Sequence, residues 1–97
     1  MARPAVLRRG GLVVDPARRI ASRGGREIEL SPKEFGVLVE LLAADGAVVS
    51  AEELLERVWD ANADPFTNTV RMTVMKLRRK LGAPEVVKTV PGAGYRV

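Results

Sequence analysis

Two reactive residue types, cysteine and histidine, are absent from the 97-residue sequence. Without cysteine the chain forms no disulfide and offers no thiolate as a nucleophile or metal ligand. Without histidine it lacks the commonest general base and metal-binding side chain. We therefore expect a protein that is not an enzyme and that holds no metal or cofactor, although pairs of carboxylates remain available for chemistry.

Long apolar runs are also missing. The longest are only a few residues, and the first eleven residues, MARPAVLRRGG, lack the apolar core of a signal peptide. A content of 46% hydrophobic residues in a chain of this length suffices for one compact core and is too little for two. We expect a single domain located in the cytoplasm.

Charge is unevenly distributed along the sequence. Residues 1–30 contain seven basic and three acidic residues, residues 31–66 contain two and eight, and residues 67–97 contain seven and one. Basic ends around an acidic middle predict one surface that meets a polyanion and another that either repels it or meets a different partner.

Residues 69–81, TVRMTVMKLRRKL, carry the strongest periodic pattern. Their apolar residues follow the i, i+4, i+7, i+11 spacing of one helix face, which we expect to be buried: Val70, Val74, Leu77 and Leu81. The opposite side and its flanks are cationic and contain no carboxylate: Arg71, Met72, Thr73, Met75, Lys76, Arg78, Arg79 and Lys80. Such a face suits a groove of nucleic acid, and the alternative is a solvated surface helix.

The segment before residue 31 has a β-like pattern. Short apolar stretches separated by Asp15-Pro16 and Gly24-Gly25 predict three short antiparallel strands, or four if Arg8 and Arg9 join the first. Residues 1–7 have little periodic signal, so we expect them to form a tail or linker and residues 8–97 to form the domain.

Two helix starts follow. Ser31-Pro-Lys-Glu34 combines a capping hydroxyl, a proline in the first turn and a glutamate that can close a capping box. This helix buries residues such as Phe35 and Leu38 and ends at Asp45-Gly46. After a connector at residues 47–49, long enough for one bridge, Ser50 and Glu53 repeat the capping spacing and open a second helix that stops near Asp60.

Residues 60–68, DANADPFTN, predict a polar loop, after which Thr67 or Asn68 caps the helix at about 68–81. The chain ends in residues 86–97, where VVKTV, a PGAG turn and YRV predict a hairpin. This order is that of an α+β winged helix-turn-helix, with an N-terminal antiparallel sheet, three helices and a C-terminal wing.

The same segments resemble the effector domain of OmpR/PhoB-type response regulators. The resemblance rests on SPKEFGVLVELLA, AEELLERVW, residues 69–81 and KTVPGAGYRV, and it covers the chain from about Leu12 to Val97. It implies a two-component regulator domain that binds promoter DNA sequence-specifically, usually as head-to-tail pairs on direct repeats. It also implies RNA polymerase contact through loop 60–68, and a receiver domain in the full-length protein. No receiver fits before Leu12, so we expect an effector fragment or a stand-alone protein.

The resemblance also assigns roles to residues. Base contacts fall to Arg71, Met72 and Lys76. The alternatives are a phosphate contact or a solvated charge for Lys76, a phosphate contact for Arg71, and exposure without a function for Arg71 and Met72. Contacts with the DNA backbone fall to Trp59, Thr69, Thr73, Arg78, Arg79, Thr89, Tyr95 and Arg96. Alternatives remain open: Trp59 and Tyr95 can instead pack in the core or on the third helix, and Arg79 and Lys80 can be diffuse or solvated charges.

Two positions depart from the family pattern. Pro91 stands at the wing tip where relatives often carry an arginine that reaches the minor groove, and Met75 stands where an arginine is common. Fewer cationic contacts predict a shallower dependence of DNA affinity on salt than in arginine-richer relatives. The alternatives to DNA binding are a protein-interaction module with a winged-helix fold and an RNA-binding domain.

Overall fold

The computed structural model describes residues 6–60 and 67–97 of the chain. Four strands come first, followed by helical segments and a final pair of strands. Their bounds are β1 (Leu7–Arg9), β2 (Leu12–Asp15), β3 (Ile20–Arg23), β4 (Arg26–Ile28), α1 (Pro32–Ala43), α2 (Ala51–Leu54), η1 (Leu55–Trp59), α3 (Thr69–Leu81), β5 (Lys88–Val90) and β6 (Gly94–Arg96). This order confirms the expected α+β winged-helix architecture.

The first four strands form an antiparallel sheet in the order β1-β2-β3-β4. Arg8 pairs with Val13 and Arg9 with Leu12, so the two arginines belong to β1. The sheet therefore has four strands, the larger of the two numbers expected from the sequence. β1 begins at Leu7, and residues 1–5 of the expected tail lie outside the described residues.

Helix α1 begins as its sequence predicts. The Ser31 hydroxyl accepts a hydrogen bond from the Glu34 N–H, and a Glu34 carboxylate oxygen accepts one from the Ser31 N–H at 2.9 Å. This reciprocal pair is a complete capping box, with Pro32 in the first turn. The last helical residue is Ala43, and Asp45 and Gly46 follow with positive φ angles, which confirms the expected end.

The second helix starts at Ala51 and continues as a π-helical turn, η1, that ends at Trp59. The Ser50 hydroxyl accepts from the Glu53 N–H at 3.0 Å, and the Glu53 carboxylate lies 3.4 Å from the same hydroxyl. The cap is therefore present, although the Glu53 carboxylate contacts the Ser50 hydroxyl and not, as in a capping box, the Ser50 N–H. The wider winding of η1 is a feature that the sequence did not reveal.

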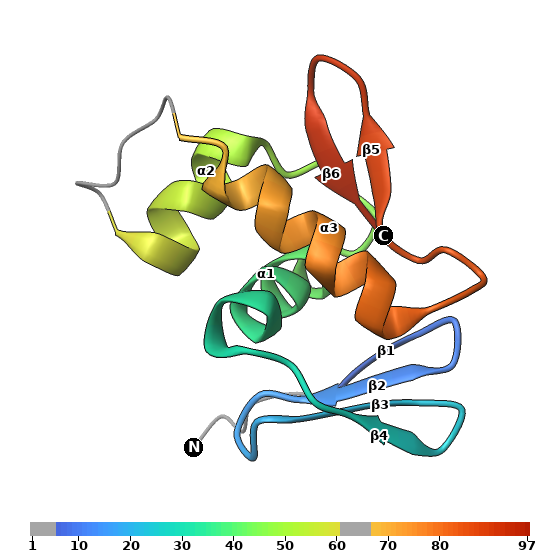
Figure 1. Cartoon of the computed structure of the whole chain (residues 1–97). Coiled ribbons are helices and arrows are strands. Elements are labelled where there is room, and N and C mark those ends of the chain that lie inside the picture. Colours follow the sequence, from blue (N-terminus) through green and yellow to red (C-terminus); the bar gives the residue numbers. More distant parts are fainter. Residues whose placement is uncertain (1–5, 61–66) are drawn as a thin grey trace.

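Helix α1 lies between α3 and the four-stranded sheet, and the β5–β6 hairpin rises beside α3 (Figure 1). The six residues that the sequence analysis names as buried are all buried: Phe35, Leu38, Val70, Val74, Leu77 and Leu81. They share one cluster with sheet residues such as Leu12 and Val14 and with Val87 beside the hairpin. Within residues 6–60 and 67–97, no helix has the length and apolarity needed to cross a membrane.

Candidate nucleic-acid interface

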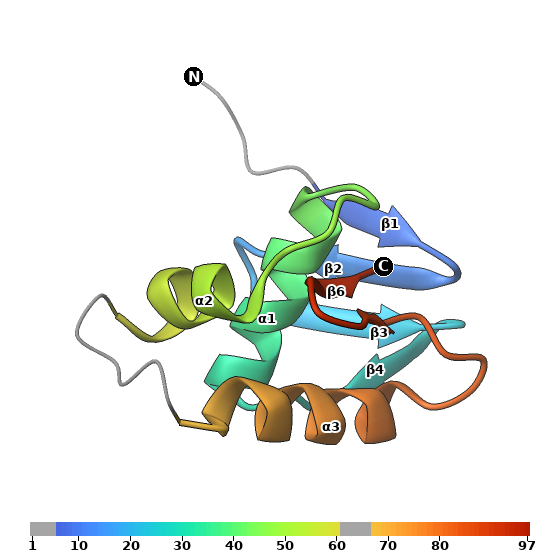
Figure 2. The ribbon, with the colours of Figure 1, turned by 90° about the horizontal axis from the view of Figure 1, so that it is seen from above.

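Helix α3 lies along one edge of the molecule, with the remaining helices and the sheet behind it (Figure 2). Its four apolar residues at the predicted spacing are at most 5% exposed, which confirms the inner face. Of the two candidate caps, Thr67 contributes, since its hydroxyl accepts from the Thr69 N–H at 3.3 Å, whereas the Asn68 side chain makes no capping bond. Gly82, with a φ of 76°, ends the helix.

The outer face of α3 exposes the three residues that we expect to contact bases, Arg71, Met72 and Lys76. Met72 is 41% exposed and Met75, one turn further on, is 45% exposed, although both are large and apolar. An exposed methionine side chain on this face can contact a thymine methyl group. Thr73 is half-buried, and its hydroxyl donates to the Thr69 carbonyl at 2.8 Å.

Lys80 differs from its neighbour Arg79, although the sequence offers a diffuse or solvated charge as an interpretation of both. Arg79 is exposed, but the Lys80 ammonium lies 2.7 Å from the carboxylate of Glu34, which is only 4% exposed. This interpretation is wrong for Lys80 because Glu34 lies 46 residues away in sequence and reaches α3 only through the packing of α1.

The same contact shifts the acidity of Glu34. Burial by itself raises the pKa of this carboxyl, but the hydrogen bond from Lys80, the Ser31 N–H and the positive charge of Lys80 outweigh burial and hold the pKa below its ordinary value. Glu34 is therefore ionised at neutral pH. It joins the start of α1 to the last turn of α3.

Arg78 connects α3 to the hairpin. Its Nε donates to the Val87 carbonyl at 2.9 Å, and its Nη2 donates to the hydroxyl of Thr89. The guanidinium carbon lies 5.8 Å from the centroid of the Tyr95 ring, within cation–π range. Three of the expected backbone-contact residues, Arg78, Thr89 and Tyr95, thus form one cluster where α3 meets the wing.

The wing is a hairpin of β5 and β6 in which Thr89 pairs with Tyr95. Tyr95 also exchanges two backbone hydrogen bonds with Val49, of 2.8 and 2.9 Å, which is the single bridge expected in the connector. A side chain at Gly94, whose φ is 147°, would collide with the Val49 carbonyl, so this approach requires glycine. Pro91 is exposed at the turn, and Arg96 is exposed on β6.

Trp59 lies at the end of η1, before residues 61–66, which are outside the described part of the chain. Its ring is half-buried against the core, as expected, and the Lys33 ammonium sits 5.5 Å from the ring centroid while donating to the Val58 carbonyl at 3.0 Å. The indole is therefore partly buried, and the Lys33 ammonium lies over its ring.

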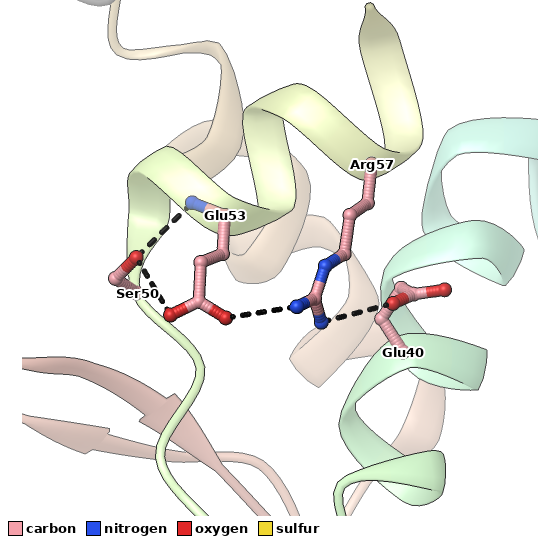
Figure 3. Close-up of polar contacts among 4 residues, drawn as sticks. All are labelled: Glu40, Ser50, Glu53 and Arg57. Atoms are coloured by element: carbon pink, nitrogen blue, oxygen red, sulfur yellow. Dashed lines mark hydrogen bonds and ion pairs between the residues drawn. The ribbon is translucent and has the colours of Figure 1, made fainter.

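A chain of polar contacts fixes α2 and η1 against α1 (Figure 3). Arg57 lies 3.3 Å from a Glu53 carboxylate oxygen one turn earlier and 3.5 Å from a Glu40 oxygen on α1. Glu53 in turn touches the capping hydroxyl of Ser50. One guanidinium therefore links the second helical segment to α1, through ion pairs between partly exposed side chains that contribute modestly to stability.

Sequence reasoning missed Arg23. This residue of β3 reaches the C-terminal end of α3, where its guanidinium donates to carbonyl oxygens. An arginine at the end of a short strand looks like a solvated charge in the sequence, and no local signal pairs it with residues almost sixty positions away.

Residues 25–97 match the protein family described as "Transcriptional regulatory protein, C terminal". The chain is 62% identical over 94 residues to the transcriptional regulatory protein CutR of Streptomyces coelicolor, covering 97% of this chain and 43% of CutR. Its fold is similar to the DNA binding domain of CpxR from E. coli, with a TM-score of 0.86, 35% identity and coverage of 96% and 95%. It is also similar to the Klebsiella pneumoniae RstA DNA-binding domain solved in complex with the RstA box, with a TM-score of 0.83, 30% identity and 94% coverage of both chains. The chain spans less than half the length of CutR.

Proposed function

Because the chain belongs to the family of C-terminal domains of transcriptional regulatory proteins, we propose that it binds double-stranded DNA sequence-specifically and regulates transcription. Helix α3 enters the major groove, and the β5–β6 hairpin acts as the wing beside it. The observation that carries this proposal is the outer face of α3, which is exposed, cationic and free of carboxylates along its whole length. The RstA domain bound to its DNA box supports it by analogy.

Within this function, the base-contacting side chains are Arg71, Met72 and Lys76. All three are exposed on the outer face of α3. A lysine or arginine can donate to guanine O6 and N7, and a methionine can contact a thymine methyl. Lys76 is one turn from Met72, so the two side chains can address neighbouring base pairs.

A second set of residues anchors the DNA backbone and fixes the register of the protein on the duplex. It comprises Trp59, Thr69, Thr73, Arg78, Arg79, Thr89, Tyr95 and Arg96. Arg78 uses only two of its five N–H groups in the hydrogen bonds to Val87 and Thr89, which leaves donors for a phosphate. The half-buried ring of Trp59 similarly leaves one side of the indole for the backbone.

The partners beyond DNA follow from the family and from charge. We propose that the chain is the effector half of a two-component response regulator, with a receiver domain in the full-length protein, acting in the cytoplasm on direct repeats. The exposed glutamates of α2 and η1, such as Glu52 and Glu56, add to the acidic character of the middle of the chain. This supports a protein partner for the acidic middle of the chain, and our candidate for contact with RNA polymerase is residues 60–68, of which 61–66 lie outside the described part of the chain.

Selection of bound duplexes from a random-sequence pool tests the proposal. We expect a defined motif, repeated in tandem, and an affinity that falls with salt. Lys76→Ala should relax specificity at one base pair, whereas Arg79→Ala should weaken all sequences about equally. A domain that shows no preference over scrambled DNA and no salt dependence would instead be a protein-interaction module.

A further inference from the structure

The side chain of Arg23 bridges the four-stranded sheet and the end of α3. Arg23 is the last residue of β3, where it pairs with Leu12 on one side and Arg26 on the other. Its Nη1 donates to the carbonyl oxygens of Leu81 and Gly82, both at 2.9 Å, and its Nη2 donates to that of Pro84. One guanidinium thus donates hydrogen bonds to three carbonyl oxygens.

These carbonyls are a favourable target for a cation. The last carbonyls of a helix have no partner inside the helix and carry the negative end of its dipole. Leu81 is the final residue of α3 and Gly82 follows it directly. A planar guanidinium can satisfy several acceptors at once with fixed geometry, which an ammonium point charge does much less well.

The segment held by Arg23 lies between two contacts with Arg78, whose carbonyl accepts from the Gly82 N–H and whose Nε donates to the Val87 carbonyl. Residues 82–85 are all exposed, and they form neither helix nor strand. The chain re-enters the core only at Val87, directly before β5. This segment connects α3 to the wing, and both views show it next to the turns of the sheet (Figures 1 and 2).

We infer that Arg23 is a positioning residue for DNA recognition, because it fixes the end of α3 and the segment leading to the wing onto the sheet. Its guanidinium thereby acts with Arg78, which joins α3 to the hairpin directly, in setting the relative placement of the two elements that meet DNA together. The inference rests on the proposed function and adds a role for the N-terminal sheet. Without Arg23, α3 and the wing sample other relative placements, and the apparent affinity falls in proportion to the fraction that remains competent to bind.

Arg23→Ala and Arg26→Ala form a matched pair for the test. Both remove one positive charge from adjacent strands, but within the described part of the chain the exposed side chain of Arg26 makes no hydrogen bond or ion pair. The measurements are affinity at several salt concentrations for the duplex recovered from the random pool, and the melting temperature of each variant. Arg23→Lys, which keeps the charge, is the conservative variant.

We expect Arg23→Ala to bind the selected duplex about three- to tenfold more weakly at a temperature where it is fully folded. The slope of log affinity against log salt should stay as in Arg26→Ala, which should itself lose less than about twofold. Arg23→Lys should restore part of the affinity. Unchanged affinity with a lowered melting temperature would reduce Arg23 to a stabilising residue. A slope shallower by about 0.9 than that of Arg26→Ala would make it a phosphate contact.

An NMR comparison keeps the inference testable without DNA. The amide signals of residues 82–90 should move or broaden in Arg23→Ala and stay in place in Arg26→Ala. If wild-type protein selected no duplex, the proposed function would fail, and these signals would still decide whether Arg23 positions the wing. Unmoved signals in Arg23→Ala would overturn the inference even if DNA binding were established.

Discussion

Lys80→Ala and Arg79→Ala are neighbouring substitutions in the last turn of α3 that should have unequal effects on stability. Each removes one positive charge, but only Lys80 contacts the carboxylate of Glu34, at 2.7 Å. Glu34 is 4% exposed, so Lys80→Ala leaves a buried carboxylate without its charged donor. Arg79 is exposed, so its removal should change the free energy of unfolding by no more than about 0.5 kcal/mol.

The expected size for Lys80→Ala follows from the exposure of the two partners. Breaking a fully buried ion pair costs about 3–5 kcal/mol, and a hydrogen bond to a charged group contributes about 1.5–3 kcal/mol. The Lys80 side chain is 42% exposed, so water can partly replace it, and the lower range applies. We expect a loss of about 1.5–2 kcal/mol, equivalent to roughly 6–15 °C in melting temperature for a domain of this size.

The pH dependence of this loss has a definite sign. The pKa of Glu34 is lowered in the folded protein, so its ionised form contributes stability above the ordinary value of 4.5, and that contribution disappears as pH falls through the lowered pKa. Urea unfolding followed by Trp59 fluorescence, at pH 7 and again below the lowered pKa, should therefore show a large difference between the two variants only at pH 7. Equal stability of the two variants at pH 7, or a difference that persists in acid, would show that Lys80 does not stabilise the ionised Glu34.

Three further substitutions test the wing and the core. Pro91→Arg places a cation at the wing tip and should steepen the slope of log DNA affinity against log salt by about 0.9, while Pro91→Ser should leave the slope unchanged. Equal slopes in the two variants would show that the wing tip does not reach the DNA. Gly94→Ala should lower the free energy of unfolding by about 3 kcal/mol or more in urea titrations, because the φ of Gly94 is 147° and the methyl group would strike the Val49 carbonyl. Gly92→Ala is the control: the methyl group would meet open space, and the substitution should lower the free energy of unfolding by about 1 kcal/mol. Similar losses at the two glycines would contradict this account of the bridge. Leu77→Ala, at a position that is 0% exposed, should cost about 2–5 kcal/mol in the same titration, and a loss below 1 kcal/mol would mean that α3 is not seated as described.

Features that depend on neighbouring residues can be predicted from the sequence alone. Ser31 and Glu34 cap a helix because they are three residues apart, and the inner face of α3 follows from the helical spacing of Val70, Val74 and Leu77. The exposed cations of the outer face follow from the same spacing. The hairpin is similarly local, because Pro91, Gly92 and Ala93 form the turn between β5 and β6.

Which cations make contacts within the protein and which face outward depends on how distant segments pack together. Lys80 and Arg23 look like solvated charges in the sequence, yet one neutralises the buried Glu34 and the other holds the end of α3. Their partners lie 46 and 58 residues away and meet them only when α1 and the sheet pack in place. The sequence shows how many basic residues a helix carries and which face they share. Whether each one contacts a group within the protein or remains available for DNA depends on the segments that pack beside it.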